Sequence, residues 1–267
     1  MPIDHSENII ELSHVSFAYT KHLVVKDVSL PIHRGDYLGI IGPNGGGKTT
    51  LLKLMLGLLT PQAGAIKLFG EESTQFNRWS KIGYVPQLIS ADGDLTGYEN
   101  LMLSAMLHGL NQHQRETRIE QLLEFMQLKD VADRLVKGYS GGMIRKLEIA
   151  QALLHHPKVL FLDEPTVGLD PGAKKAIWNF IKDWIKNFHT TILMTTHDMN
   201  EADKLCDNIA FMHQGRIMII DTPAKLKETL GEGSTLDDAF IYYTGTSVNQ
   251  GDINDVQQTR RTISHLD

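Results

Sequence analysis

Residues 42–49 read Gly-Pro-Asn-Gly-Gly-Gly-Lys-Thr, which fits the pattern G-x-x-x-x-G-K-[ST] of a phosphate-binding loop. The loop follows an apolar run at residues 37–41 and precedes residues 50–56, whose apolar side chains recur at helical spacing. Strand, glycine loop and helix, in that order, form the context that the motif requires. The stretch therefore predicts an α/β domain that binds the phosphates of a nucleotide.

The residues of this loop suit a triphosphate. Successive backbone N–H groups form a nest that binds anions, and the start of the next helix adds partial positive charge. Gly42 and Gly47 permit turns and a close approach that a Cβ would block. We expect Lys48 to reach the β- and γ-phosphates and the Thr49 hydroxyl to bind Mg²⁺. The expected nucleotide-binding residues in this stretch are Gly42, Pro43, Asn44, Gly45, Gly46, Gly47, Lys48, Thr49 and Thr50.

Composition narrows the class of protein. Of the 267 residues, 42% are apolar and 22% are charged, as in ordinary soluble proteins. The formal net charge of −6 argues against a nucleic-acid binder, and the single cysteine, Cys206, excludes an internal disulfide. The start of the chain lacks a signal-peptide pattern, and no apolar run is long enough to cross a bilayer. We expect a cytoplasmic protein that acts at a membrane only through a partner.

Strand and helix patterns alternate along the rest of the chain. Residues 37–41, and residues 158–162 after the initial Lys158, are apolar without alternation, which is typical of strands buried on both faces. From about residue 95 to 156 the pattern is helical, which predicts a helical insertion between two halves of an α/β core. The other expected elements are strands at 9–17, 23–32 (ending near Pro31), 64–69, 82–85 and 191–195, a hairpin at 209–220 turning at 213–215, and helices at 171–186, 199–205, 222–230 and 236–243.

Two adjacent acids follow the second buried strand. Asp163 ends that strand and can hold Mg²⁺ through its carboxylate oxygens. Glu164 comes next and can polarise an attacking water as a general base. Taken alone, Asp163 has a simpler interpretation, which is a strand that ends in Asp by chance. Because two acids repel a triphosphate unless cations compensate, the pair together with Lys48 indicates a metal–nucleotide complex.

A second glycine-rich helix start lies at Ser140, Gly141, Gly142 and Met143. Ser140 is most simply a helix N-cap. The two glycines, however, leave bare N–H groups that form a second surface for anions. A single chain with one nucleotide does not need two such surfaces, whereas a symmetric dimer does, because each subunit can close over the nucleotide of the other.

In this order the motifs resemble the nucleotide-binding subunit of an ATP-binding cassette (ABC) transporter. The resemblance covers about residues 8–243. Gly46 departs from the family pattern, since Ser or Ala is commoner there, and so does Met143, where Gln is usual. Gly46 lacks a side chain that the backbone nest does not need, and its absence is expected to make the loop more flexible. Met143 lacks one polar contact that Gln would make. Neither change predicts an inactive enzyme.

The resemblance implies roles for residues that are ambiguous alone. Tyr19 resembles the aromatic residue that stacks on adenine, Gln87 the glutamine that senses Mg²⁺, and His197 the histidine that contacts the γ-phosphate. Without the resemblance, Tyr19 would be interpreted as an edge-strand tyrosine, Gln87 as a polar loop residue and His197 as a structural histidine. The implied catalytic residues are Lys48, Glu164 and His197, and the implied metal ligands are Thr49, Gln87 and Asp163. Tyr19 and Gln87 are expected to contact the nucleotide together with the loop. The signature residues Ser140, Gly141, Gly142 and Met143 are expected to face the ATP of a second subunit, and Asp170 is expected to lie at the dimer interface.

The resemblance also implies a fold and a domain division. The expected fold is an α/β P-loop NTPase (RecA-like) core with an antiparallel β subdomain and an inserted α-helical subdomain. The ABC ATPase domain is expected at residues 8–243, with the helical insertion at about 90–157. Residues 244–267 are polar without periodicity and are expected to form a mobile tail.

The implied function is ATP hydrolysis with Mg²⁺ that drives a separate transmembrane permease, on the cytoplasmic face of a membrane. A second nucleotide-binding subunit, identical or different, completes each site. The signature and residues 95–101 and 236–245 resemble the branch that serves exporters, so export is favoured. Residues 41–58 and 82–87 also resemble metal-ion importers, so import stays an alternative. A soluble ABC ATPase, a small-molecule kinase and a non-hydrolysing scaffold are the rivals from other classes.

Overall fold

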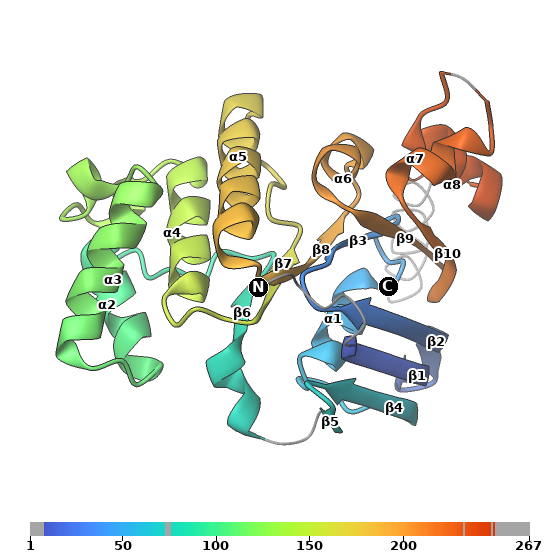
Figure 1. The fold of residues 1–267 in the computed structure, drawn as a ribbon, viewed down its shortest axis with the longest axis horizontal. Coiled ribbons are helices and arrows are strands. Elements are labelled where there is room, and N and C mark those ends of the chain that lie inside the picture. Colours follow the sequence, from blue (N-terminus) through green and yellow to red (C-terminus); the bar gives the residue numbers. More distant parts are fainter. Residues whose placement is uncertain (1–7, 73–75, 232, 247, 249–267) are drawn as a thin grey trace, which may run out of the picture. The chain divides into compact units, whose positions relative to one another are not determined.

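The computed structural model describes residues 8–72, 76–231, 233–246 and Val248. The chain forms two compact units (Figure 1). The second unit is Phe76–Leu193, and the first contains the segments on either side of it.

An antiparallel sheet opens the first unit, with strand order β2-β1-β4-β5. Its strands are β1 (Asn8–Tyr19), β2 (His22–His33), β4 (Ala63–Leu68) and β5 (Glu71–Glu72). Buried and exposed positions largely alternate along β1 and β2, as expected for a sheet with one face on a core. The strand expected at residues 23–32 is β2, which ends one residue later at His33, and Pro31 within it pairs with Glu11. The proline is tolerated because β2 is an edge strand.

The first unit also carries parallel strand pairing. Strand β3 (Tyr37–Ile41) pairs in parallel with β9 (Asn208–His213), and β9 pairs antiparallel with β10 (Arg216–Asp221). All five residues of β3 are buried, as its unbroken apolar run predicted. The hairpin turns at Gln214 and Gly215, both with positive φ. The helices of this unit are α1 (Lys48–Met55), α6 (Met199–Leu205), α7 (Pro223–Glu228) and α8 (Leu236–Thr244).

The second unit contains a parallel pair of strands and most of the long helices (Figure 1). Ile82 of β6 (Ile82–Val85) lies opposite Val159 of β7 (Val159–Asp163). Helix α4 packs against β6, α2 and α5. The helices are η1 (Phe76–Lys81), α2 (Gly97–Leu107), α3 (Gln112–Phe125), η2 (Lys129–Val131), η3 (Val136–Gly138), α4 (Gly141–Leu153) and α5 (Pro171–Phe188). Strand β8 (Thr191–Thr196) begins in this unit and ends in the first.

Local capping explains where several of these helices begin. Thr96 and Glu99 form a capping box at the start of α2, and Asn111 with Gln114 does the same for α3. Asp170 caps α5, and Pro171 occupies its first turn, as the sequence predicted. Helix α5 ends two residues later than expected, at Phe188, where His189 adopts a left-handed conformation.

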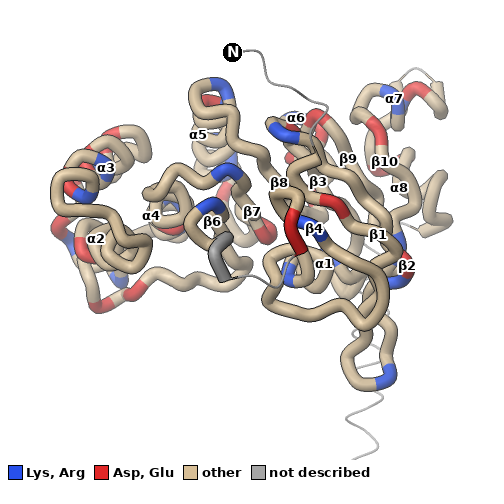
Figure 2. The backbone as a smooth tube through the Cα atoms, turned by 60° about the horizontal axis from the view of Figure 1, so that its bottom comes forward, with Lys and Arg blue, Asp and Glu red and all other residues tan. Residues whose placement is uncertain are grey.

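Charge is mixed along the chain. Helix α3 carries both acidic and basic residues (Figure 2).

No described helix is long and apolar enough to cross a membrane. Helix α8 ends at Thr244, Gly245 caps it in a left-handed conformation, and Val248 is buried. Most of the predicted mobile tail, residues 249–267, lies outside the described residues, and the domain limits of 8–243 and 90–157 stay predictions.

Candidate nucleotide-binding site

The phosphate-binding loop connects β3 to α1 within the first unit. Gly47 is the N-cap of α1 and has a φ of 100°, a conformation that L side chains rarely adopt. Lys48 begins the helix and is 5% exposed. Its Nζ donates hydrogen bonds to the carbonyl oxygens of Gly42, at 2.9 Å, and Pro43, at 3.1 Å. The ammonium group is therefore held over the loop.

Neighbouring backbone holds the same loop closely. A Cβ on Gly42 would overlap the carbonyl oxygen of Met212 in β9. The Gly215 N–H donates to the Gly46 carbonyl at 3.1 Å, and the Lys26 N–H donates to the Gly215 carbonyl at 2.8 Å. Strand β2, the β9–β10 turn and the loop are thus linked by main-chain hydrogen bonds.

Gly46 fits this tight loop. Its N–H donates to the Pro43 carbonyl at 3.1 Å, and a Cβ at this position would lie 2.9 Å from that oxygen. A side chain at position 46 would therefore require a small shift of the loop. Because Gly46 has no side chain, we expected a looser loop, but its two main-chain hydrogen bonds restrain the loop.

Two further predicted residues lie in the first unit. Tyr19 ends β1, is 45% exposed and packs edge-to-face on Phe17, with ring centroids 4.9 Å apart. His197 follows β8 and is partly buried. Asp198, next to it, caps α6, and the Asp198 N–H donates to Thr196 Oγ1 at 3.0 Å. The cap fixes the backbone on which His197 sits.

The acidic pair lies in the second unit at the end of β7. Asp163 is 1% exposed and Glu164 is 5% exposed. Glu164 has a φ of 48°, a left-handed conformation that strains a non-glycine residue. Gln87 Nε2 donates to Glu164 Oε2 at 3.3 Å. Burial and the charge of Asp163 raise the pKa of the nearby Tyr84 to about 12, so this phenol stays protonated at neutral pH.

The signature residues form the start of α4, also in the second unit. Ser140 is the N-cap, and its Oγ accepts a hydrogen bond from the Met143 N–H at 3.3 Å. Ser140 and Gly141 are exposed. A Cβ on Gly142 would lie 2.8 Å from the Cβ of Ala173 in α5. The plainer interpretation of Ser140 as a cap is therefore correct, and Gly142 has a packing role; contact with a second nucleotide stays a prediction.

Asp170 acts locally as a cap. Its Oδ1 accepts hydrogen bonds from the N–H groups of Gly172, at 2.9 Å, and Ala173, at 3.0 Å. The residue is exposed. This cap explains the acid at this position without a dimer, so its interface role stays a prediction.

The predicted residues divide between the units. The first unit holds residues 42–50, Tyr19 and His197, whereas the second holds Gln87, Asp163, Glu164, the signature residues and Asp170. The contact between Gln87 and Glu164 joins a predicted metal ligand to the predicted base within the second unit. The predicted metal ligands Thr49, Gln87 and Asp163 offer hydroxyl, amide and carboxylate oxygens, and such hard donors fit Mg²⁺.

Sequence reasoning missed two charged residues of α4. Arg145 is 5% exposed and Glu148 is 3% exposed, although charged residues are almost never buried unless paired. They lie three residues apart among the buried apolar residues of the helix. That spacing on an apolar face is the signal that could have identified them.

Comparison with known proteins fits this geometry. The family model described as "ABC transporter" matches residues 25–167. The chain belongs to the ABC transporter family. It is an ATP-binding subunit of that family and an ATPase. The predicted fold class is confirmed, because solved structures of ABC ATP-binding subunits share the fold.

Similar proteins include two named "Nod factor export ATP-binding protein I". The protein from Cupriavidus pinatubonensis (strain JMP 134 / LMG 1197) is 41% identical over 218 residues, which are 81% of this chain and 67% of that protein. The protein from Sinorhizobium fredii (strain NBRC 101917 / NGR234) is 41% identical over 229 residues, which are 85% of this chain and 66% of that protein.

Two solved structures support the fold. One, titled as the structure of the ATP binding subunit of an ABC transporter, superposes with a TM-score of 0.78 at 30% identity, over 88% of this chain and 99% of that chain. The other is cbiO1 from Clostridium perfringens, described as part of the ABC transporter complex cbiONQ. It has a TM-score of 0.74 at 27% identity, over 83% of this chain and 91% of that chain.

Proposed function

We propose that this ABC ATPase powers export through a separate transmembrane permease, at the cytoplasmic face of a membrane. The observation that carries export is the 41% identity to a Nod factor export ATP-binding protein across 81% of the chain. The exporter-like signature around Ser140 and the stretch at residues 95–101 support the same branch. Which compound is exported depends on the permease, which lines the path.

The phosphate loop holds the triphosphate in this proposal. Its backbone N–H groups and the start of α1 face the phosphates, and the Lys48 ammonium exchanges its loop carbonyls for phosphate oxygens. Tyr19, half exposed at the end of β1, stacks on the adenine. Thr49, Asp163 and Gln87 would hold Mg²⁺, which neutralises charge on the phosphates when bound.

Glu164 acts as the general base. Its carboxylate is nearly buried, and the hydrogen bond from Gln87 orients it before nucleotide binds. The left-handed backbone at Glu164 costs about 1–3 kcal/mol, which a structure retains where a side chain must point in one direction. His197 holds the γ-phosphate while the carboxylate takes a proton from the attacking water.

A second nucleotide-binding subunit completes the site. Ser140 and Gly141 are exposed at the start of α4, so their N–H groups are open to a nucleotide held by another chain. Met143 and Gly142 extend this surface, and Asp170 lies at the interface. ATP then joins two subunits, and hydrolysis separates them.

The permease docks on the second unit. A groove of about 260 Å³ there is lined by residues of η1, β6, α2 and α4, among them Trp79, Tyr84 and His108. Leu88, 81% exposed, and Leu107, 80% exposed, belong to the same unit. A groove suits a short amphipathic helix of a partner, and exposed apolar side chains on the same unit favour such an interaction.

Isolation of the chain with its membrane partner tests this function. The tagged chain is expressed in its own host, and the detergent-solubilised complex is purified and identified. Export predicts one permease and ATP hydrolysis that is faster in the complex than in the isolated chain. A solute-binding protein that co-purifies and stimulates hydrolysis would overturn export in favour of import. Recovery with ribosomes or DNA in place of a permease would overturn transport.

A further inference from the structure

A buried ion pair on α4 is unexplained by the reaction described above. Arg145 Nη1 lies 3.1 Å from Glu148 Oε2, and the two side chains are 6% and 1% exposed. Burying such a pair gains little stability on its own, because the cost of desolvation offsets the attraction. Two apolar residues of similar size would pack in the same space. The charges therefore call for a further role.

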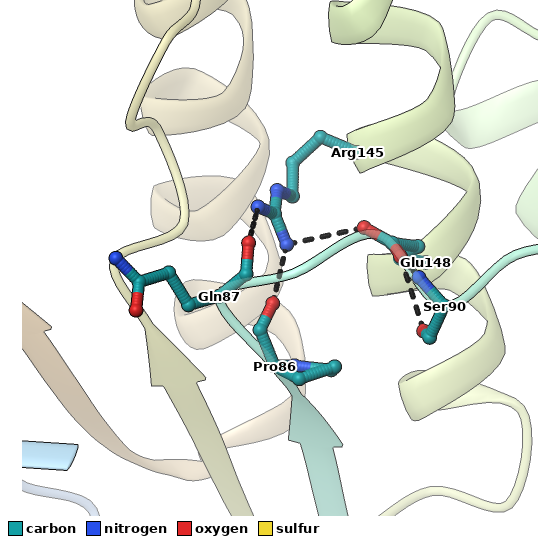
Figure 3. A network of polar contacts seen from close by, with 5 residues as sticks. All are labelled: Pro86, Gln87, Ser90, Arg145 and Glu148. Carbon is teal, nitrogen blue, oxygen red and sulfur yellow. Dashed lines mark hydrogen bonds and ion pairs between the residues drawn. The ribbon is translucent and has the colours of Figure 1, made fainter.

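Both side chains reach the segment that follows β6, residues 86–90. The Arg145 guanidinium donates hydrogen bonds to the carbonyl oxygens of Pro86, at 2.7 Å, and Gln87, at 2.9 Å. Glu148 Oε1 accepts hydrogen bonds from the N–H and, at 3.0 Å, the hydroxyl of Ser90. Figure 3 shows the guanidinium above the two carbonyl groups, with the Glu148 carboxylate between it and Ser90.

These contacts replace a strand ladder. Strand β6 ends at Val85, so the backbone groups of residues 86–90 lose their strand partners. The side chains of α4 supply new partners for the Pro86 and Gln87 carbonyl groups and for the Ser90 N–H. The segment is thus fixed to one helix at both of its ends.

The fixed segment connects two parts of the proposed site. Between its ends, the Gln87 side chain contacts Glu164. Helix α4 itself begins at the Ser140 cap, five residues before Arg145, a distance of about 7.5 Å along a helix that rises 1.5 Å per residue. A displacement of residues 86–90 must therefore move the helix that carries the signature.

We propose that Arg145 and Glu148 are positioning residues that lock residues 86–90 to α4, so that the contact of Gln87 with Glu164 and the placement of the signature change together. The proposal deepens the proposed function, because it rests on Glu164 as the base and on the signature as a nucleotide contact. The pair touches no nucleotide; it acts through Gln87 on one side and through the start of α4 on the other.

The test replaces the pair by apolar residues of similar size, Arg145→Met together with Glu148→Leu, in the full chain. Such a replacement of a buried ion pair is often neutral for stability. We expect the unfolding temperature to stay near that of the original protein. The Ser90 amide should exchange its hydrogen about tenfold faster, since it loses its acceptor. The kcat for ATP should fall about tenfold while KM is unchanged.

A matched control uses an exposed pair of the same unit. Lys129 Nζ lies 2.9 Å from Glu124 Oε2 near the end of α3, and both side chains are mostly exposed. The variant Lys129→Met with Glu124→Leu should change neither Ser90 exchange nor kcat. Arg145→Lys keeps the charge and leaves Glu148, the acceptor for Ser90, but lacks the forked donors, so it should keep most of the Ser90 protection and give a kcat between those of the original protein and the double variant.

Three results would overturn the proposal. A double variant with the original Ser90 exchange would show that the pair does not fix the segment. Faster exchange with the original kcat would show that fixing the segment does not matter for the reaction. A loss of kcat that occurs only with a fall in unfolding temperature would assign the pair to stability alone. Hydrogen exchange is measured without nucleotide, so the first result is independent of whether Glu164 is the base.

Discussion

At the scale of single residues, three features of its surroundings restrict the conformation of Glu164. It combines burial, a left-handed backbone and a hydrogen bond from Gln87. Such strain persists where the surrounding structure over-determines a conformation, and it gathers at functional sites. Lys48 is held comparably, by two carbonyl groups of its own loop. The proposed base and the proposed phosphate ligand are therefore preorganised before nucleotide binds.

The variant Glu164→Gln tests the base. It keeps the shape and the hydrogen-bonding capacity of the side chain but cannot take a proton. We expect ATP hydrolysis to fall by about 100-fold or more, while ATP binding is retained. Phosphate release and the binding of a fluorescent ATP analogue measure the two quantities. Glu124→Gln, at an exposed acid of α3, is the control. Full turnover by Glu164→Gln would refute the assignment.

His155 makes stability depend on pH. Burial, with the neighbouring His108, lowers its pKa to about 4, and its Nε2–H donates to the Ile82 carbonyl at 2.8 Å. An unfolded histidine has a pKa near 6.5, so the unfolded chain binds more protons between pH 6.5 and pH 4. The stability that His155 contributes is thus present above pH 6.5 and is lost as the pH falls towards 4.

Thermal unfolding at several pH values tests this dependence. In His155→Gln, whose amide can still donate to the Ile82 carbonyl, the loss of stability from pH 7 to pH 4.5 should be smaller by roughly 1 kcal/mol, allowing for the partial exposure of the side chain. Replacement of His33, a partly exposed histidine of the first unit, by Gln is the control for the substitution itself. Equal losses in the original chain and in His155→Gln would contradict the assignment.

At the scale of elements, α4 is the member that connects most features of the second unit. It packs against β6, α2 and α5, it begins with the signature, and it fixes residues 86–90. It lies close to α5 at Gly142, where a Cβ would meet the Cβ of Ala173 at 2.8 Å. Gly141, one residue earlier, has room, since its Cβ would lie 3.4 Å from Leu169.

This difference predicts opposite effects of the same substitution at adjacent glycines. Gly142→Ala should destabilise the protein by about 1–2 kcal/mol, because α4 and α5 must move apart. Gly141→Ala should be neutral or slightly stabilising, because alanine favours a helix. Urea unfolding measures both free energies of unfolding. Ala173→Gly should restore part of the loss in Gly142→Ala, and an unchanged loss would contradict the packing argument.

At the scale of the whole molecule, the proposed function depends on two copies of a nucleotide-binding subunit. Each chain offers an exposed helix start at Ser140 and Gly141 that its own phosphate loop does not require. The exposed N–H groups are suited to an anion that comes from outside the chain. The family assignment is established by the relatives, whereas dimerisation is part of the proposal.

Gly141→Asp, introduced into Glu164→Gln, tests the dimer. An acid in the first turn of a helix is stabilising, so folding should be unaffected or slightly improved. The same charge repels the phosphates of a nucleotide held by another subunit, so the ATP-dependent dimer should be lost. Light scattering with and without ATP and Mg²⁺ measures the mass, with Gly141→Ala as the control. An ATP-dependent dimer that survives Gly141→Asp would place the signature away from the nucleotide.

The elements whose patterns are local were predictable. Strand β3, strand β6 and helix α6 have the expected bounds, because an unbroken apolar run or a capped amphipathic helix depends on neighbours in the sequence. Strand β2 extends one residue beyond each expected bound, and it can include Pro31 because the sheet places β2 at its edge. Edge or centre is a property of the sheet and is absent from the strand's own pattern.

The sequence alone determined the class of this protein, because a phosphate-binding loop, an acid at a strand end and a glycine-rich helix start are each defined by contiguous residues. The tertiary structure alone decided the partners of Arg145 and Glu148, which lie more than 50 residues from the segment they hold. The role of a buried charged residue can be assigned only once its contacts are known. Those contacts are set by the packing of α4 on β6 and do not follow from the spacing of residues along the chain.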